Sequence, residues 1–310
     1  MATIILNSQT VTYTNIYYIS AIGNDSTGDG TKAKPFLTYD KALSKTTNGD
    51  LIYFIKGNYN ITNLTAISYG SAYIYDNGKQ LTIYSEPYTY ITINNPSNSA
   101  RDTHAICISN SNTKVIGFTI DYNVTDRSNS YSRSIFGAVD AGYLNGYIYN
   151  CHFIIRSATS FSYANSGNSL KCINCQFDIK TTMESSYSGS TSFNYCTFNL
   201  PQSGVSSSGF INLGNNIFSI SYDINYTPTP FNKDYGVYFG LYVWKVIKYL
   251  IQDGTIVTRS IDGVSTNNVG TTPFDKSIFD NYGMYGLSNI NSVVISKLIN
   301  NKFKVAIYKK

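Results

Sequence analysis

The chain has 310 residues, of which only 13% are charged and 15% are aromatic, with 29 Tyr against a single Trp. Its apolar share of 42% is too high for a disordered chain. The net charge is +5, but Lys and Arg are scattered rather than clustered, which argues against a nucleic-acid-binding face. These numbers favour a folded, β-rich and turn-rich chain.

Residues 1–16 are predicted to form a separate N-terminal strand segment that serves attachment. They contain neither a basic stretch nor a long apolar one, so we expect no secretory signal. The most apolar run, residues 235–251, carries Lys245 and Lys248 and is too short to span a bilayer. We therefore expect a chain that is made in a cytoplasm and does not insert into a membrane.

Residues 17–59 predict a strand, a glycine-rich loop, a short helix and a second strand. Thr38 is placed to cap the helix, and Tyr39, Ala42 and Leu43 share one face of it. A helix laid over the first strands would shield an open sheet edge.

The middle of the chain repeats one short pattern. YNCHFII at 149–155 returns as INCQFDI at 173–179 and as NYCTFNL at 194–200. Period-2 spacing places Cys and Phe on one face of a strand, and such strands bury that face by stacking. We therefore predict a parallel β-helix over residues 17–232, with these repeat positions facing inward: Phe118, Phe153, Phe177, Phe198 and Phe218.

Five cysteines invite a metal or disulfide interpretation. Cys172 and Cys175 form a CxxC pair, but no second pair or neighbouring histidine completes a zinc pattern. We expect reduced, buried cysteines, no metal site and no cofactor.

The repeat stops after residue 231. Short strands with tight turns at 252–255 and 260–263, and a last strand at 303–308, predict a small C-terminal module over residues 233–310.

Several motifs carry family resemblances. The segments YYI at 17–19, GND at 23–25, PFLT at 35–38 and GNY at 57–59 resemble the entry of right-handed parallel β-helix proteins of the pectate-lyase-like superfamily. The resemblance implies an all-β, right-handed parallel β-helix with a short N-terminal capping helix. YLIQDGTIVT, FDNYGMYGLS and KFKVAIYKK resemble modules at the ends of tail and appendage proteins of phages that infect Gram-positive hosts.

One candidate site follows from the spacing. The third residue after successive repeat Phe residues is Asp121, Arg156 and Lys180. Stacked in register, these residues would form an outward charge column. It is either a solvated salt ladder or, on a lyase, a set of groups that bind a uronate and abstract its proton. The sequence shows no cluster of acids for calcium, and we expect no catalytic residues and no metal ligands.

These observations predict a non-enzymatic structural protein of a phage virion, such as a tail fibre, appendage, baseplate or other surface element. Its β-helix would serve assembly, binding of a host-surface glycan, or both. Its partners would be other virion proteins and itself, as a homotrimer, and it would reside in the virion after synthesis in the host cytoplasm. Two alternatives remain: a polysaccharide depolymerase acting as lyase or glycoside hydrolase, and a bacterial surface adhesin.

Overall fold

The structure is a computed structural model. It describes residues 1–67, 70–94, 102–124, 133–137, 144–157, 160–163, 169–180, 191–200, 216–223, 251–252, 255–256, 260–261, 264–265, 290–297 and 302–309. The chain divides into two compact units, which are described separately below. The first comprises residues 1–176 and 187–192, and the second comprises residues 177–186 and 193–310.

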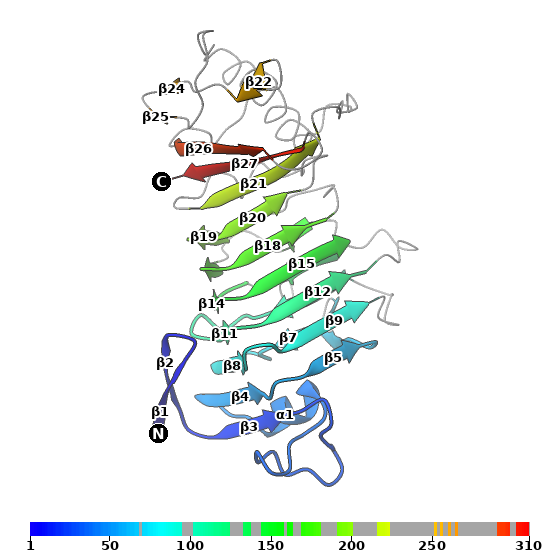
Figure 1. The fold of residues 1–310 in the computed structure, drawn as a ribbon. Coiled ribbons are helices and arrows are strands. Elements are labelled where there is room, and N and C mark those ends of the chain that lie inside the picture. The colour runs from blue at the N-terminus through cyan, green and yellow to red at the C-terminus, as the bar shows by residue number, and fades with distance from the viewer. Residues whose placement is uncertain are drawn as a thin grey trace. The chain divides into compact units, whose positions relative to one another are not determined.

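The described part of the first unit contains four coils of three strands each (Figure 1). The first two coils are β4 (Asp50–Phe54), β5 (Asn58–Ile61) and β7 (Gly70–Tyr75), then β8 (Leu81–Ser85), β9 (Tyr90–Asn94) and β10 (Asp102–Cys107). The next two are β11 (Lys114–Ile116), β12 (Thr119–Asn123) and β13 (Arg133–Gly137), then β14 (Tyr147–Tyr149), β15 (His152–Ser157) and β16 (Ser160–Tyr163).

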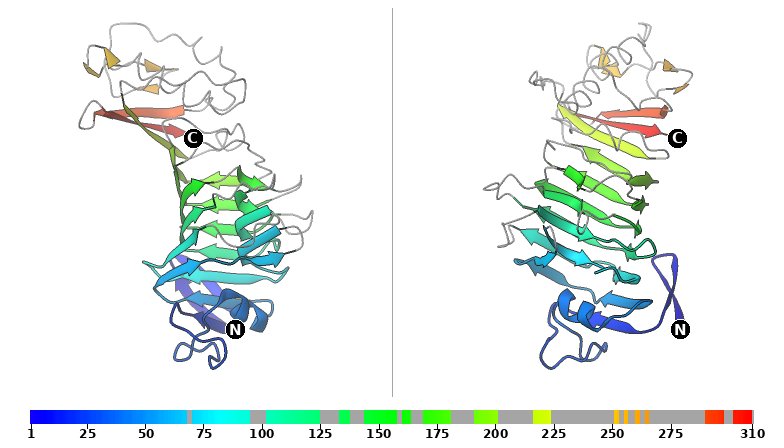
Figure 2. Two further views of the ribbon diagram at one scale, coloured as in Figure 1. Left: turned by 90° about the vertical axis from the view of Figure 1, so that its right-hand side faces the viewer. Right: turned by 180° about the vertical axis from the view of Figure 1, so that it is seen from behind.

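Equivalent strands of successive coils pair in parallel, which gives the sheets β4–β8–β11–β14, β5–β9–β12–β15 and β7–β10–β13–β16. Figure 2 shows the same stack from two further sides. The first sheet is extended by β3 (Ile16–Ile19) and β17 (Lys171–Ile173), while β6 (Thr65–Ile67) pairs antiparallel with β7. The predicted parallel β-helix is confirmed.

The interior consists of the alternate residues of each strand. Ile91, Ile120 and Phe153 pair across β9, β12 and β15, and all three are fully buried. This register corrects one detail of the predicted repeat. Phe153 is equivalent to Ile120 rather than to Phe118, which precedes β12 and corresponds to Cys151.

Coil length explains this shift. The register runs 33 residues from Lys114 to Tyr147 but only 24 from Tyr147 to Lys171. The repeat is aligned correctly on the corner residue between two strands of a coil. Gly117, Asn150 and Asn174 occupy this corner in successive coils, and all three have positive φ. The five cysteines, including Cys151, are free and buried.

The capping helix is α1 (Tyr39–Lys45). The side chain of Thr38 accepts a hydrogen bond from the Lys41 amide at 3.2 Å, as an N-cap residue does. The helix buries Tyr39, Ala42 and Leu43. The prediction for this element is confirmed down to its cap and its buried face.

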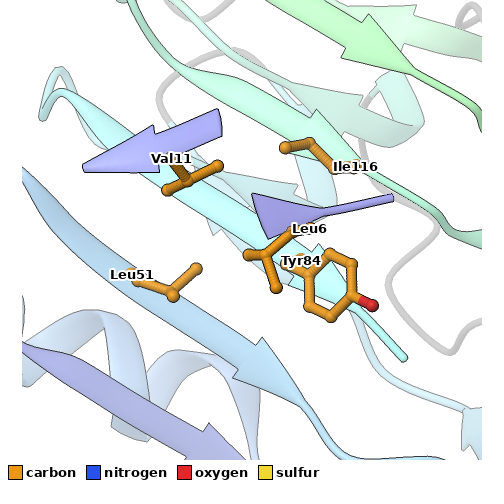
Figure 3. Packing of buried hydrophobic residues seen from close by; sticks show 5 residues of the cluster. All are labelled: Leu6, Val11, Leu51, Tyr84 and Ile116. Atoms are coloured by element: carbon orange, nitrogen blue, oxygen red, sulfur yellow. The ribbon is translucent and has the colours of Figure 1, made fainter. Parts of the chain in front are cut away.

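The N-terminal residues form a hairpin of β1 (Ala2–Leu6) and β2 (Gln9–Tyr13). Its Leu6 and Val11 pack against Leu51, Tyr84 and Ile116, which come from β4, β8 and β11 (Figure 3). The predicted segment 1–16 therefore packs on the outer side of one solenoid sheet, and its role in attachment stays a prediction.

Strands β18 (Gln176–Ile179) and β19 (Ser192–Asn194) cross the chain positions at which the two units divide. In the second unit, β20 (Thr197–Leu200) pairs parallel with β21 (Ile217–Asp223). Antiparallel pairing then continues through β27 (Lys302–Lys309) to β26 (Ile290–Lys297). Phe177 and Phe198 stack with their centroids 4.9 Å apart, so the like-on-like stacking predicted for these repeat residues is confirmed.

The C-terminal segment contributes two further hairpins of two-residue strands. They are β22 (Ile251–Gln252) with β23 (Thr255–Ile256), and β24 (Ser260–Ile261) with β25 (Val264–Ser265). The predicted boundary between residues 232 and 233 lies outside the described residues and stays a prediction.

Candidate functional site

The outward residues of β5, β9, β12 and β15 form a surface that we call the polar face. The strand register places them in two rows. Their inward neighbours are buried in the core, so the outward side chains are the ones available to a ligand. The rows are Asn58–Tyr90–Thr119–His152 and Asn60–Thr92–Asp121–Ile154.

An ion pair lies at the centre of the polar face. Arg156 donates from Nε to Asp121 Oδ1 at 2.8 Å and from its second guanidinium nitrogen to Oδ2 at 2.8 Å. The Tyr90 hydroxyl donates to the same Oδ2 at 2.7 Å. Asp121 is almost buried with 8% of its side chain exposed, whereas Arg156 is 51% exposed.

The surroundings keep Arg156 and Tyr90 protonated. The hydrogen bond from Arg156 to Asp121, followed by the attraction between their charges, raises the pKa of Arg156. Partial burial, followed by its hydrogen bond to Asp121, raises the pKa of Tyr90. Arg156 and Tyr90 therefore both act as hydrogen-bond donors at neutral pH. The ion pair of Arg156 with Asp121 carries no net charge.

The three residues of the predicted charge column have different placements. Asp121 and Arg156 do meet, but diagonally, because Asp121 pairs in register with Ile154. Lys180 is an exposed residue of the second unit that follows β18. Their role in binding stays a prediction.

A groove of about 690 Å³, which we call the cap groove, adjoins the polar face. It is formed by the start of α1 and by the segment that leads from β5 to β6. Its buried aromatic lining includes Tyr59 and Tyr73. Exposed polar side chains also line it: Thr38, Asp40, Asn58, Asn60, Thr62 and Asn63.

One carboxylate, that of Asp40, faces the cap groove and is held in place. It accepts hydrogen bonds from the Tyr75 hydroxyl at 2.9 Å and from the Thr65 hydroxyl. Asn58 and Asn60 belong both to the groove and to the polar face, so the two surfaces are continuous. The signal available in the sequence was the polar residue at every second position of NYNIT.

Two other described carboxylates near the coils accept hydrogen bonds from the backbone. Asp25 accepts from the Leu37 amide at 2.8 Å, and Glu86 accepts from the Lys56 amide at 2.8 Å. Among the described residues, no group of three or more His, Cys, Asp or Glu side chains is placed to hold a metal ion. In the same part of the chain, no helix has the length and apolarity needed to cross a membrane.

The histidine on β10 is sealed in the interior. His104 is 2% exposed, and its Nδ1 lies 2.7 Å from the Ser134 hydroxyl. That hydroxyl donates to the Phe136 carbonyl at 2.7 Å, so the ring nitrogen of His104 is the donor to Ser134. Burial lowers the pKa of His104 to about 4. A neutral, enclosed imidazole of this kind supports the core and is out of reach of a substrate.

Comparison with known proteins gives structural likeness alone. No family model matches the chain, and no curated protein matches it. A solved rhamnogalacturonan lyase is 16% identical, with a TM-score of 0.45, over 61% of this chain and 54% of its own. The pectate lyase Pel9A is 13% identical, with a TM-score of 0.28, over 62% of this chain and 64% of its own. This chain thus spans under two thirds of either structure.

The prediction that this chain is not an enzyme is corrected here. Both solved structures that it matches are named as lyases, so it was wrong to exclude an activity on the grounds of missing sequence motifs. At this identity and these TM-scores the likeness assigns neither an activity nor a substrate to this chain.

Proposed function

We propose that the first unit binds a weakly charged, hydroxyl-rich glycan along the cap groove and the polar face. The observation that carries this proposal is the continuity of the two surfaces through Asn58 and Asn60. Amide, hydroxyl and phenol groups both donate and accept hydrogen bonds, as sugar hydroxyls require. The tyrosines at the base of the groove are buried and hold its shape, so the exposed polar side chains make the contacts with the sugar.

The charge of the surface supports a ligand with little charge of its own. Arg156 is the described cation at the centre of the polar face, and Asp121 already neutralises it. A strongly acidic polymer would have to compete with Asp121 for the guanidinium and would also meet the Asp40 carboxylate. Sugars without charged groups meet neither obstacle.

The wider role that we propose is that of a phage surface protein which presents this glycan-binding face on the virion. Its support is the resemblance of the C-terminal segments to modules of phage tail and appendage proteins. A rigid solenoid suits such a role, because its outer faces are long and exposed. Assembly with other virion proteins or as a homotrimer belongs to the same proposal.

A second candidate function, for a different ligand that contains uronate, is cleavage by a lyase reaction. Its support is that Asp121, Arg156 and Tyr90 converge on an accessible face beside the groove. In this reaction a base removes the proton next to a uronate carboxyl group. The glycosidic oxygen then leaves with its electron pair, and a carbon–carbon double bond forms.

The test is a binding screen of the full chain against a panel of neutral and acidic polysaccharides, by affinity electrophoresis and calorimetry. Asn60→Ala removes one side chain shared by the groove and the polar face. We expect it to weaken binding several-fold, by about 1 kcal/mol. Ser26→Ala, at an exposed serine outside the cap groove and the polar face, is the control and should bind as the unaltered chain does.

The same samples separate binding from cleavage. A lyase leaves an unsaturated sugar that absorbs in the ultraviolet, and viscosity falls as the polymer shortens. Binding without either change supports the glycan-binding role alone, whereas both changes, lost in Arg156→Gln, support the lyase. If no polysaccharide binds, or if Ser26→Ala weakens binding as much as Asn60→Ala does, the proposal is wrong.

A further inference from the structure

A second cavity lies on a different sheet, between the N-terminal hairpin and the coils. It has a volume of about 210 Å³. Strand β2 contributes the hydroxyls of Thr10 and Thr12, and β8 contributes that of Thr82. Two amide side chains and one ammonium group complete its polar lining: Gln80, Asn112 and Lys114. None of these lining residues is acidic.

The charge of Lys114 is not compensated by a described carboxylate. The two acids of the adjoining turns, Asp50 and Asp76, are fully buried. Asp50 accepts four hydrogen bonds from Asn15 and Thr47. Asp76 likewise accepts four, from Gly78, Ser109 and Asn110. These acids are therefore committed to holding the turns.

A second lysine continues the same surface. The register aligns Lys114 with Tyr147 and Tyr147 with Lys171, so the three side chains form one outward row. The Lys171 ammonium lies 4.9 Å from the centroid of the Tyr147 ring. Tyr149 lies beside Tyr147 with the two rings nearly parallel, at an interplanar angle of 4°. Strand spacing puts the two lysines about 10 Å apart at their Cα atoms.

We propose that this row, with the cavity under the hairpin, is an anion-binding site for a sugar polymer that carries carboxylate or phosphate groups. One acidic group would enter the cavity at Lys114, where ammonium and hydroxyl donors converge. The sugar would lie along the row beside Tyr147, and a second acidic group would meet Lys171. This ligand class differs from that of the polar face, because here no carboxylate among the described residues pairs with the two lysines. The site does not depend on the proposed function.

The hairpin is part of this site, because Thr10 and Thr12 come from it. Its Leu6 and Val11, packed on the sheet, hold the two hydroxyl-bearing positions over β8 and β11. The N-terminal segment therefore both covers an apolar surface and completes the wall of a polar cavity.

The experiment measures binding of the full chain to three immobilised polymers: alginate for carboxylates, poly(glycerol phosphate) for phosphates, and dextran as the neutral reference. We expect binding to at least one acidic polymer, with an affinity that falls as salt is raised, whereas any binding of dextran at the polar face should change neither with salt nor in Lys114→Gln. Lys114→Gln and Lys171→Gln should each weaken binding by roughly three- to ten-fold, as expected for the loss of a charge-assisted contact.

Two further variants make the result specific. Lys32→Gln removes the same charge from an exposed loop of the same unit and should leave affinity unchanged. Thr10→Val keeps the shape of the hairpin but removes a cavity hydroxyl, and should weaken binding about two- to five-fold. Equal effects of Lys32→Gln and Lys114→Gln would overturn the proposal, as would failure to bind either acidic polymer. Binding to only one of them identifies the acidic group.

Discussion

The two outer faces of the same solenoid differ in how they satisfy their charges. On the polar face, Arg156 is matched by Asp121, so the surface is neutral within itself. On the sheet that includes β8, β11 and β14, the lysines at positions 114 and 171 have no described carboxylate beside them. The backbone is the same stack of parallel strands in both places, so the difference comes from the side chains alone.

The faces also differ in how they treat apolar surface. The polar face has an open groove at its end. The sheet of β4, β8 and β11 instead carries Leu51, Tyr84 and Ile116 on its outer side, where the N-terminal hairpin covers them. A repeated fold can thus carry two surfaces with different ligand preferences. A segment from outside the repeat determines how much of each surface remains open.

The largest expected effect is the release of the N-terminal hairpin from the sheet on which it packs. Leu6→Ala together with Val11→Ala should weaken hairpin docking by about 4 kcal/mol, because each side chain is almost completely buried. Amide hydrogen exchange in residues 2–13 should then accelerate strongly. Ile5→Ala, on the same strand but 73% exposed, is the control. Equal exchange in the two variants would show that the apolar contact does not hold the hairpin.

The next effect limits the pH range in which the faces can be compared. The pKa of His104 is about 4 in the folded chain, against an ordinary value of 6.5. Between these pH values the unfolded chain binds more protons, so stability falls as pH drops. The loss is complete near pH 4 and amounts to about 3 kcal/mol.

Urea unfolding between pH 7.5 and pH 4 measures this loss. His104→Gln has no group that titrates in this range at that position, so the difference in unfolding free energy from the unaltered chain should shrink as pH falls. If the difference in unfolding free energy stays constant with pH, burial does not lower the pKa of His104 in the folded chain.

A smaller effect tests whether the polar face is neutral because of its ion pair. Asp121→Asn should cost about 1 kcal/mol of unfolding free energy, a modest amount because half of the Arg156 side chain is in solvent. It should also lower the pKa of Tyr90, since Asp121 helps to raise that pKa. An ultraviolet titration of the tyrosines, with Tyr90→Phe to identify the band, measures the shift. An unchanged Tyr90 titration would contradict the described contact.

The smallest expected effect tests whether Lys171, in the row with Lys114 and Tyr147, contributes to folding or only to binding. Lys171→Met removes a cation from the Tyr147 ring but keeps an unbranched apolar side chain. We expect a loss of about 0.5 kcal/mol in thermal unfolding, as for an exposed cation–π contact. A much larger loss would mean that Lys171 supports the fold, and its effect on polymer binding would then need a different explanation.

Much of the fold could be predicted from local patterns. The Thr38 cap, the buried face of α1, the inward cysteines and the final strand all follow from spacing rules that act over a few residues. The register between the third and fourth coils could not be predicted in this way. Equivalent positions are 33 residues apart there but only 24 residues apart in the next step of the same sheet. Counting from Phe118 to Phe153 displaced the charge column by two residues.

The candidate sites show the same division. The sequence identified Asp121 and Arg156 as outward charges but missed the cap groove, the row of Lys114, Tyr147 and Lys171, and the place of the hairpin. Those features join residues that are tens of positions apart.

The sequence by itself determined that this chain stacks strands into a parallel β-helix, because alternation and turn residues act locally. The tertiary structure alone decided which outward side chains became neighbours. Each coil adds its own length, and one residue of difference changes every lateral contact between strands. The pairing of Arg156 with Asp121, and the absence of such a described partner for Lys114, are therefore properties of the register.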